Sequence, residues 1–138
     1  MSKKILLIFI GLFTIILTGC GSKEEILTCY LEEDNGIITY KAKIEEDELV
    51  ELTYIEEKNF DSKELAQKNY EMIEQLFFIF ESYEGVTLEN KIKGTKSIYS
   101  MSVDIKKVKE SKQEGLEMEF ETLEEFNEFI KTNNYICK

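Results

Sequence analysis

Apolar and polar residues alternate along residues 26–55, a pattern that predicts three consecutive strands. Asn35-Gly36 is typical of a two-residue hairpin turn, and this turn would place the apolar side chains of the first two strands on one face. The expected cross-strand pairs are Leu31 with Tyr40, Cys29 with Ala42, and Leu27 with Ile44. A three-residue loop at 46–48 would continue this apolar face into a third strand. The expected pairs there are Ala42 with Leu52 and Tyr40 with Tyr54.

The apolar spacing changes to that of a helix after Phe60. Asp61 is expected to cap the N-terminus of this helix, and Phe60 is expected to pack onto Leu65. The breadth of the apolar stripe predicts a helix that belongs to the core. The stripe runs through Leu65, Ala66, Asn69, Tyr70, Met72, Ile73, Leu76, Phe77, Phe80 and Tyr83.

The sequence LFFIF at 76–80 is apolar on every side of the same helix. This end of the helix is therefore either surrounded by protein or exposes Phe78 and Ile79. If they are exposed, the two side chains form a candidate patch for a partner.

A second hairpin is predicted from two further runs, Val86–Lys93 and Lys96–Ile105. Gly94-Thr95 between them suits a two-residue turn that begins with glycine. The expected pairs are Val86 with Val103, Leu88 with Met101, and Asn90 with Tyr99.

The C-terminal quarter contains a shorter helix and a last strand. Residues 106–115 are polar, with one helical turn at most, while Leu116, Met118 and Phe120 alternate as in an extended segment. Thr122 and Glu125 form a capping box that opens a short helix. The final strand is expected at 135–137.

The predicted element order is β-β-β-α-β-β-α-β, which indicates an α+β domain spanning residues 26–138. Its antiparallel sheet is expected to pack against one long and one short helix. The length suits a single domain.

The first twenty residues have the parts of an export signal. Lys3 and Lys4 precede an apolar run from Ile5 to Leu17, which is shorter than the roughly 20 residues that a helix needs to cross a bilayer. The run closes on Leu17-Thr18-Gly19-Cys20, which resembles the lipobox of bacterial lipoproteins.

This resemblance implies that residues 1–19 are a cleaved signal peptide and that Cys20 carries a thioether-linked diacylglycerol. Residues 20–25 would then tether the domain to the extracytoplasmic face of the cell membrane, where two acyl chains bind stably. An uncleaved anchor helix and an ordinary cleaved signal are the alternatives. Each of these also places the domain outside the cytoplasm.

The charge of the chain is strongly acidic, with 17 Lys and Arg against 28 Asp and Glu and a net charge of −11. After loss of Lys3 and Lys4, 15 basic residues face 28 acidic ones, which leaves −13. Nucleic acid and anionic lipid headgroups are therefore disfavoured as partners. The chain has no His, so no side chain titrates near neutrality at its unperturbed pKa.

Cys29 and Cys137 are the thiols that remain once Cys20 is acylated. An extracytoplasmic setting permits a disulfide between them. Two unpaired thiols, with Cys29 a small core residue, are the alternative.

Several stretches of the domain are similar to the YehR-like family of small bacterial lipoproteins, whose function is unknown. They are the lipobox, ITYKAKIEEDELVELTY, YEGVTLENKIKG, and the closing YICK beside LTCY. The resemblance implies a fold and a location outside the cytoplasm. It carries no catalytic or ligand-binding residue onto this chain.

Neither a metal site nor a cofactor is expected. The acidic stretches at 32–36 and 45–48 lack the ligand spacing of an EF-hand, and histidine is absent. No catalytic residue is expected either, because the chain has no G-x-S-x-G, no S-x-x-K and no glycine-rich phosphate loop.

The sequence therefore favours a tethered binding or interaction module. Its acidic face, or the patch at Phe78 and Ile79, would meet a cationic or apolar protein or peptide. An envelope enzyme with a carboxylate site and a purely structural envelope component are the alternatives. A cleft with two carboxylates of raised pKa would favour the enzyme, and a closed surface with an exposed Phe78 patch would favour the module.

Overall fold

The computed structural model describes residues 23–113 and 118–138, which form an antiparallel sheet of six strands with helices packed on it. The strand order across the sheet is β4-β5-β3-β2-β1-β6. The strands are β1 (Glu24–Glu33), β2 (Gly36–Glu45), β3 (Glu48–Asn59), β4 (Val86–Lys93), β5 (Lys96–Asp104) and β6 (Ile136–Cys137). The helices are α2 (Lys63–Phe80), α3 (Ile105–Ser111) and α4 (Leu123–Thr132). The predicted α+β class and antiparallel sheet are confirmed.

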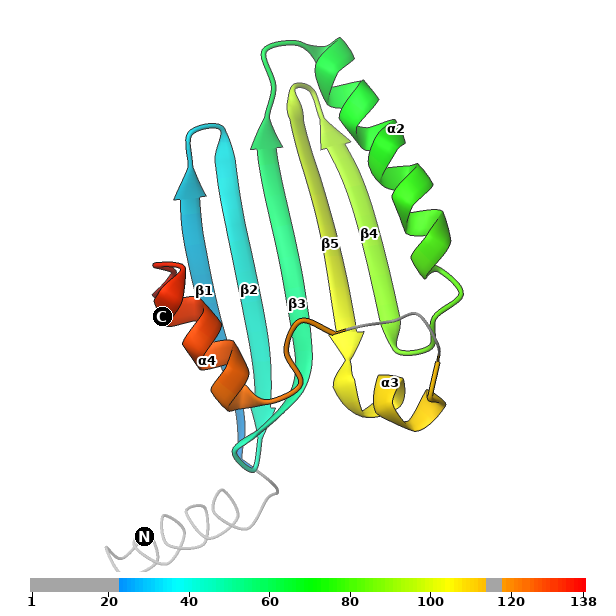
Figure 1. The fold of residues 1–138 in the computed structure, drawn as a ribbon. Helices are drawn as coiled ribbons and strands as arrows, with labels where there is room; N and C mark the ends of the chain where they lie inside the picture. Colours follow the sequence, from blue (N-terminus) through cyan, green and yellow to red (C-terminus); the bar gives the residue numbers. More distant parts are fainter. Residues whose placement is uncertain (1–22, 114–117) are drawn as a thin grey trace, which may run out of the picture.

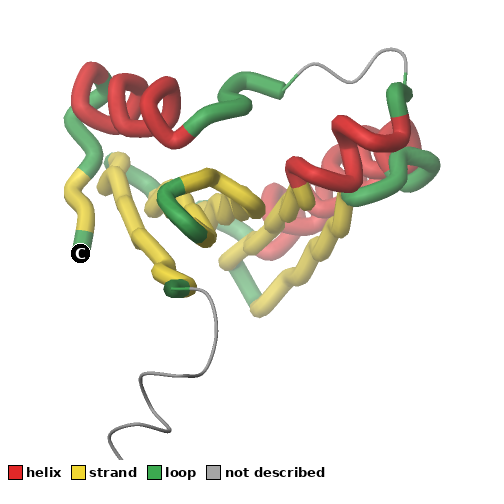
Figure 2. The backbone as a smooth tube through the Cα atoms, turned by 90° about the horizontal axis from the view of Figure 1, so that it is seen from below, coloured by secondary structure: helices red, strands yellow, loops and turns green. Residues whose placement is uncertain are grey.

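The helices cover one face of the sheet at separate places (Figure 1). α2 packs along β4 and β5, and α4 lies over β1 and β2 at the other side. Figure 2, which views the sheet end-on, shows α3 and α4 on the same side of the strands. Neither α2 nor α4 lies over the middle of this face, and the short α3 contacts β3.

The β1–β2 hairpin has a different register from the predicted one. Glu33 pairs with Gly36, so Asp34 and Asn35 make the turn and Cys29 lies opposite Tyr40. The shift is two residues, which leaves the same apolar side chains on the same face. Gly36 is needed within the strand instead, because a Cβ there would lie 1.9 Å from the carbonyl oxygen of Glu57 on β3.

The β2–β3 pairing confirms the predicted opposition of Tyr40 to Tyr54 and of Ala42 to Leu52. The loop is shorter than predicted, since it contains only Glu46 and Asp47, both with positive φ. A register shift between residues 43 and 44 accommodates the extra residue as a bulge. The expected β4–β5 pairs, Val86–Val103, Leu88–Met101 and Asn90–Tyr99, are also confirmed.

Helix α2 begins one residue later than predicted. Ser62, not Asp61, is the N-cap, and its hydroxyl accepts a hydrogen bond from the backbone N–H of Leu65 at 3.2 Å. A serine oxygen satisfies the free N–H groups of a first turn as well as a carboxylate does. The buried side chains of α2 are Ala66, Ile73 and Phe77.

The C-terminal segments follow the predicted order with one addition, the short helix α3. Met118 and Phe120 are not part of a strand, and Leu116 lies outside the described residues. Thr122 and Glu125 form the expected capping box of α4. Asn134 has a φ of 61° after α4, and the chain then enters β6.

The core lies between α4 and the strands β1 and β2, with Tyr40 at its centre. The ring of Tyr40 contacts five other aromatic rings at centroid distances between 5.2 and 6.1 Å. These rings belong to Tyr54, Phe120, Phe126, Phe129 and Tyr135. The disulfide between Cys29 and Cys137, with an S–S distance of 2.02 Å, holds β6 against β1.

Candidate functional site

Residues 1–19, the lipobox and Cys20 lie outside the described residues. Strand β1 begins at Glu24, so the described end of the expected tether already pairs with β2. In the described part of the chain, no helix is both long and apolar enough to cross a membrane.

The two residues of the expected partner patch are both exposed, Phe78 by 77% and Ile79 by 59%. They do not lie on the same side of α2, because consecutive helix positions are about 100° apart. Ile79 continues a line of exposed apolar side chains along the helix, while Phe78 points elsewhere. The members of this line are Leu65, Met72, Leu76 and Ile79.

The prediction that Leu65, Met72 and Leu76 belong to the core is wrong. They are 46%, 52% and 47% exposed, respectively. Their spacings of seven and four residues keep them on one side of α2. Only the neighbouring side, which carries Ala66, Ile73 and Phe77, is buried against the sheet.

Two hydrogen bonds fix the direction in which this exposed line faces. Asn69, on the same side of α2 as Leu65 and Met72, donates to the Ser97 hydroxyl on β5 at 3.0 Å. On the opposite flank, Asn90 of the edge strand β4 donates to the backbone oxygen of Tyr70 at 3.0 Å. The exposed apolar line therefore faces the middle of the sheet and not its outer edge.

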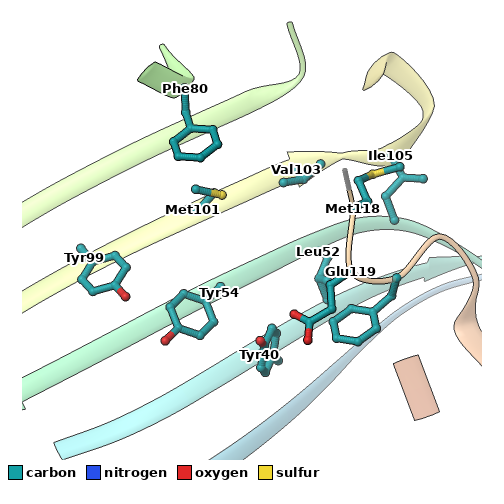
Figure 3. A pocket seen from close by; sticks show the side chains of 11 residues that line it. Tyr40, Leu52, Tyr54, Phe80, Tyr99, Met101, Val103, Ile105, Met118 and Glu119 are labelled. Carbon is teal, nitrogen blue, oxygen red and sulfur yellow. The ribbon is translucent and has the colours of Figure 1, made fainter. Parts of the chain in front are cut away.

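An apolar cavity of about 400 Å³ lies in the middle of this face (Figure 3). Its floor is formed by side chains of β2, β3 and β5, namely Tyr40, Leu52, Tyr54, Tyr99, Met101 and Val103. Phe80 at the end of α2 borders one side, and Met118, Glu119 and Phe120 border the other. We call this cavity and the exposed line of α2 together the α2–α4 groove. A volume of 400 Å³ is in the usual range of small-ligand sites.

A polar cluster anchors the tyrosines on the floor of the groove. Glu56 is buried, and its carboxylate accepts hydrogen bonds from the hydroxyls of Tyr54, at 2.7 Å, and Tyr99. Lys58 pairs with the other carboxylate oxygen at 2.7 Å. The two hydroxyls are thus bound to Glu56, which leaves the rings to line the groove.

The pKa values in this cluster follow from burial and hydrogen bonding. Burial alone would raise the pKa of Glu56, but the hydrogen bonds from Lys58, Tyr99 and Tyr54 outweigh burial and hold the pKa below 4.5. Burial, with the hydrogen bond to Glu56, raises the pKa of Tyr99 to about 12. Burial, followed by the negative charge of Glu119, raises the pKa of Tyr40. Glu56 is therefore ionised at neutral pH and the tyrosines are not.

We expect Glu56→Ala to lower the free energy of unfolding by about 2 to 3 kcal/mol, because two partly buried hydroxyls and Lys58 lose their acceptor. Urea unfolding at pH 7 measures this change. Glu57→Ala, one residue along on the opposite face of the sheet, is the control and should cost less than about 1 kcal/mol.

The lowered pKa of Glu56 also gives the direction of a pH effect. Its stabilising contribution is present above about pH 4.5, the ordinary value, and is lost as the pH falls through the lower pKa of the folded state. The stability difference between wild type and Glu56→Ala should therefore shrink below pH 4.5. A difference that stays constant down to pH 3 would contradict this account.

The described residues that line the cavity do not include two carboxylates of raised pKa, the feature that would favour the alternative of an envelope enzyme. Among the described residues that line the cavity, Glu119 is the only acidic one, and the pKa of the adjacent Glu56 is lowered, not raised. Within residues 23–113 and 118–138, no group of three or more acidic or cysteine side chains is placed to hold a metal ion. The described lining suits an apolar group.

Two solved structures resemble this arrangement of strands and helices. The solution structure of the YehR protein of E. coli matches with a TM-score of 0.67 and 17% identity, over 86% of this chain and 93% of that one. The fold is YehR-like.

A protein from Streptococcus pneumoniae TIGR4 also matches, with a TM-score of 0.53 and 18% identity, over 84% of this chain and 86% of that one. No family model matches the chain, and neither does any curated protein sequence. The resemblance at this identity concerns the YehR-like fold alone.

Proposed function

We propose that the chain is a lipid-anchored, extracytoplasmic binding module that takes an apolar ligand in the α2–α4 groove. The lipobox at Leu17–Cys20 and the basic, apolar signal before it support the anchor and the location. The disulfide between Cys29 and Cys137 is consistent with an oxidising compartment.

The observation that carries the binding proposal is the exposed apolar line of α2 beside an apolar cavity. Leu76 and Ile79 are 47% and 59% exposed on the side of α2 that faces the sheet centre. Phe80 of the same helix lines the cavity, and large exposed apolar patches are uncommon on monomeric proteins and mark binding sites. The groove is also concave and lined by aromatic side chains, as small-molecule sites are.

We expect Phe80→Glu to weaken binding of the neutral apolar dye Nile red at least about tenfold, because a carboxylate would enter the apolar lining of the cavity. The measurement is fluorescence titration of residues 23–138, with circular dichroism to verify folding. Phe78→Glu is the matched control: the same charge is added to the same helix, on the side that points away from the groove. It should leave dye binding unchanged.

Equal losses in the two variants would place the binding surface at Phe78, where the sequence had suggested a partner patch. That result would favour an interaction with an apolar or cationic protein surface over a ligand groove. A wild-type domain that does not bind the dye would contradict the proposal and favour a structural role.

A further inference from the structure

We propose that the α2–α4 groove holds a single alkyl chain whose cationic head group lies beside Glu119. This inference rests on the proposed function, since it specifies the ligand of the same groove. It is carried by three observations: the volume of the cavity, the scarcity of free hydrogen-bonding groups on its floor, and the charge at its rim.

The size of the cavity limits the ligand to a small molecule. Its volume is about 400 Å³, which is within the usual range of small-ligand sites. A single alkyl chain fits a space of this size, because it is slender and flexible.

The chemistry of the floor disfavours an extended peptide of the same thickness. A peptide would bring backbone N–H and C=O groups that need partners once they are buried. The floor offers Leu52, Met101 and Val103, and the hydroxyls of Tyr54 and Tyr99 are already bound to Glu56. The hydroxyl of Tyr40 is left among the described floor residues, and one hydroxyl cannot pair the backbone groups of a peptide. An alkyl chain needs no hydrogen bonds, so it leaves no polar group unsatisfied.

The charge of the rim selects the head group. Glu119 is the only charged side chain among the described residues that line the cavity, and it is exposed. Among the described residues, no lysine lies within 4.0 Å of its carboxylate. Figure 3 shows this carboxylate above the floor near Tyr40. A cationic head would gain the attraction of Glu119 and of the tyrosine ring faces, and an anionic head would be repelled.

The test uses the full chain in cell membranes and two photoactivatable probes. Both carry the same single alkyl chain with a diazirine; one has a trimethylammonium head and the other a sulfonate head. Mass spectrometry then locates the labelled residues. We expect the cationic probe to label the floor strands, at 52–54 and 99–103, at least about fivefold more than the anionic probe.

The variant Glu119→Gln keeps the size of the side chain and removes its charge. It should lower the ratio of cationic to anionic labelling about fivefold, whereas total labelling of the groove persists. Glu89→Gln is the matched control. Glu89 alternates with Leu88 and Asn90 on β4, so it lies on the opposite face of the sheet, and the same change in net charge there should leave the ratio unaltered.

The outcomes separate this inference from the proposed function. Equal labelling by the two probes, or a ratio that Glu119→Gln leaves unchanged, would overturn the head-group selectivity while the groove still binds apolar chains. Failure of both probes to label the floor strands would overturn the groove as a binding site, and the present inference with it.

Discussion

Removal of the disulfide between Cys29 and Cys137 is expected to lower the free energy of unfolding by about 4 to 5 kcal/mol. The bond joins residues separated by 108 positions, and a closed loop of that length strongly restricts the unfolded chain. The double variant Cys29→Ala/Cys137→Ala tests this, since it removes both thiols. Urea unfolding of oxidised wild type and of the variant gives the difference.

The control is the response to a reducing agent. Reduction should bring wild type close to the variant and should not change the variant itself. The local consequence is also measurable, because the contact of the C-terminus with β1 is short: Cys29 pairs with Cys137, Tyr30 with Ile136, and the backbone of Lys138 hydrogen-bonds to Thr28. Faster hydrogen exchange at the backbone amides of 136–138 is expected in the variant. A stability loss below about 1 kcal/mol would contradict the expectation.

Phe126→Ala is expected to lower the free energy of unfolding by about 3 to 5 kcal/mol. Phe126 has no exposed surface, and its ring contacts those of Tyr40, at 6.0 Å, and Phe120, at 5.7 Å. Truncation removes buried apolar area and leaves a cavity that the surrounding rings cannot fill. Thermal and urea unfolding, monitored by tyrosine fluorescence, measure the loss.

Phe78→Ala is the matched control for Phe126→Ala, because the same atoms are deleted from a side chain that is 77% exposed. Its effect should stay within about 0.5 kcal/mol. Similar losses for the two variants would contradict the burial of Phe126 between α4 and the sheet.

The sheet could be predicted from the sequence because its strands alternate regularly. The pairs Tyr40–Tyr54 and Leu88–Met101 were predicted correctly, since each depends on local turn residues and on a shared apolar face. The predicted β1–β2 register was wrong. Asn35-Gly36 and Asp34-Asn35 both have residues that two-residue turns favour, so the local sequence does not decide between them. The contact of Gly36 with β3 favours the observed register. That contact joins segments about twenty residues apart, which no local pattern records.

The groove could not be predicted in the same way. The periodicity of α2 marks Leu65, Met72 and Leu76 as apolar, but their exposure depends on which side of α2 packs on the sheet. Part of the polar cluster could be predicted from the sequence. Glu56 lies two residues after Tyr54 in the same strand, so the two side chains share one face of the sheet. Its pairing with Tyr99 required the β3–β5 register, which joins distant parts of the chain.

The adjacency of β1 and β6 has a consequence for the order in which the protein assembles. A chain emerges from the ribosome N-terminus first, so β1 is complete long before Ile136 and Cys137 arrive to cover its edge. During that interval the open edge is a template for pairing with other copies. The acidic pairs Glu24-Glu25 and Glu32-Glu33 at the two ends of β1 repel the same strand in a neighbouring nascent chain, and so limit aggregation until the last strand docks.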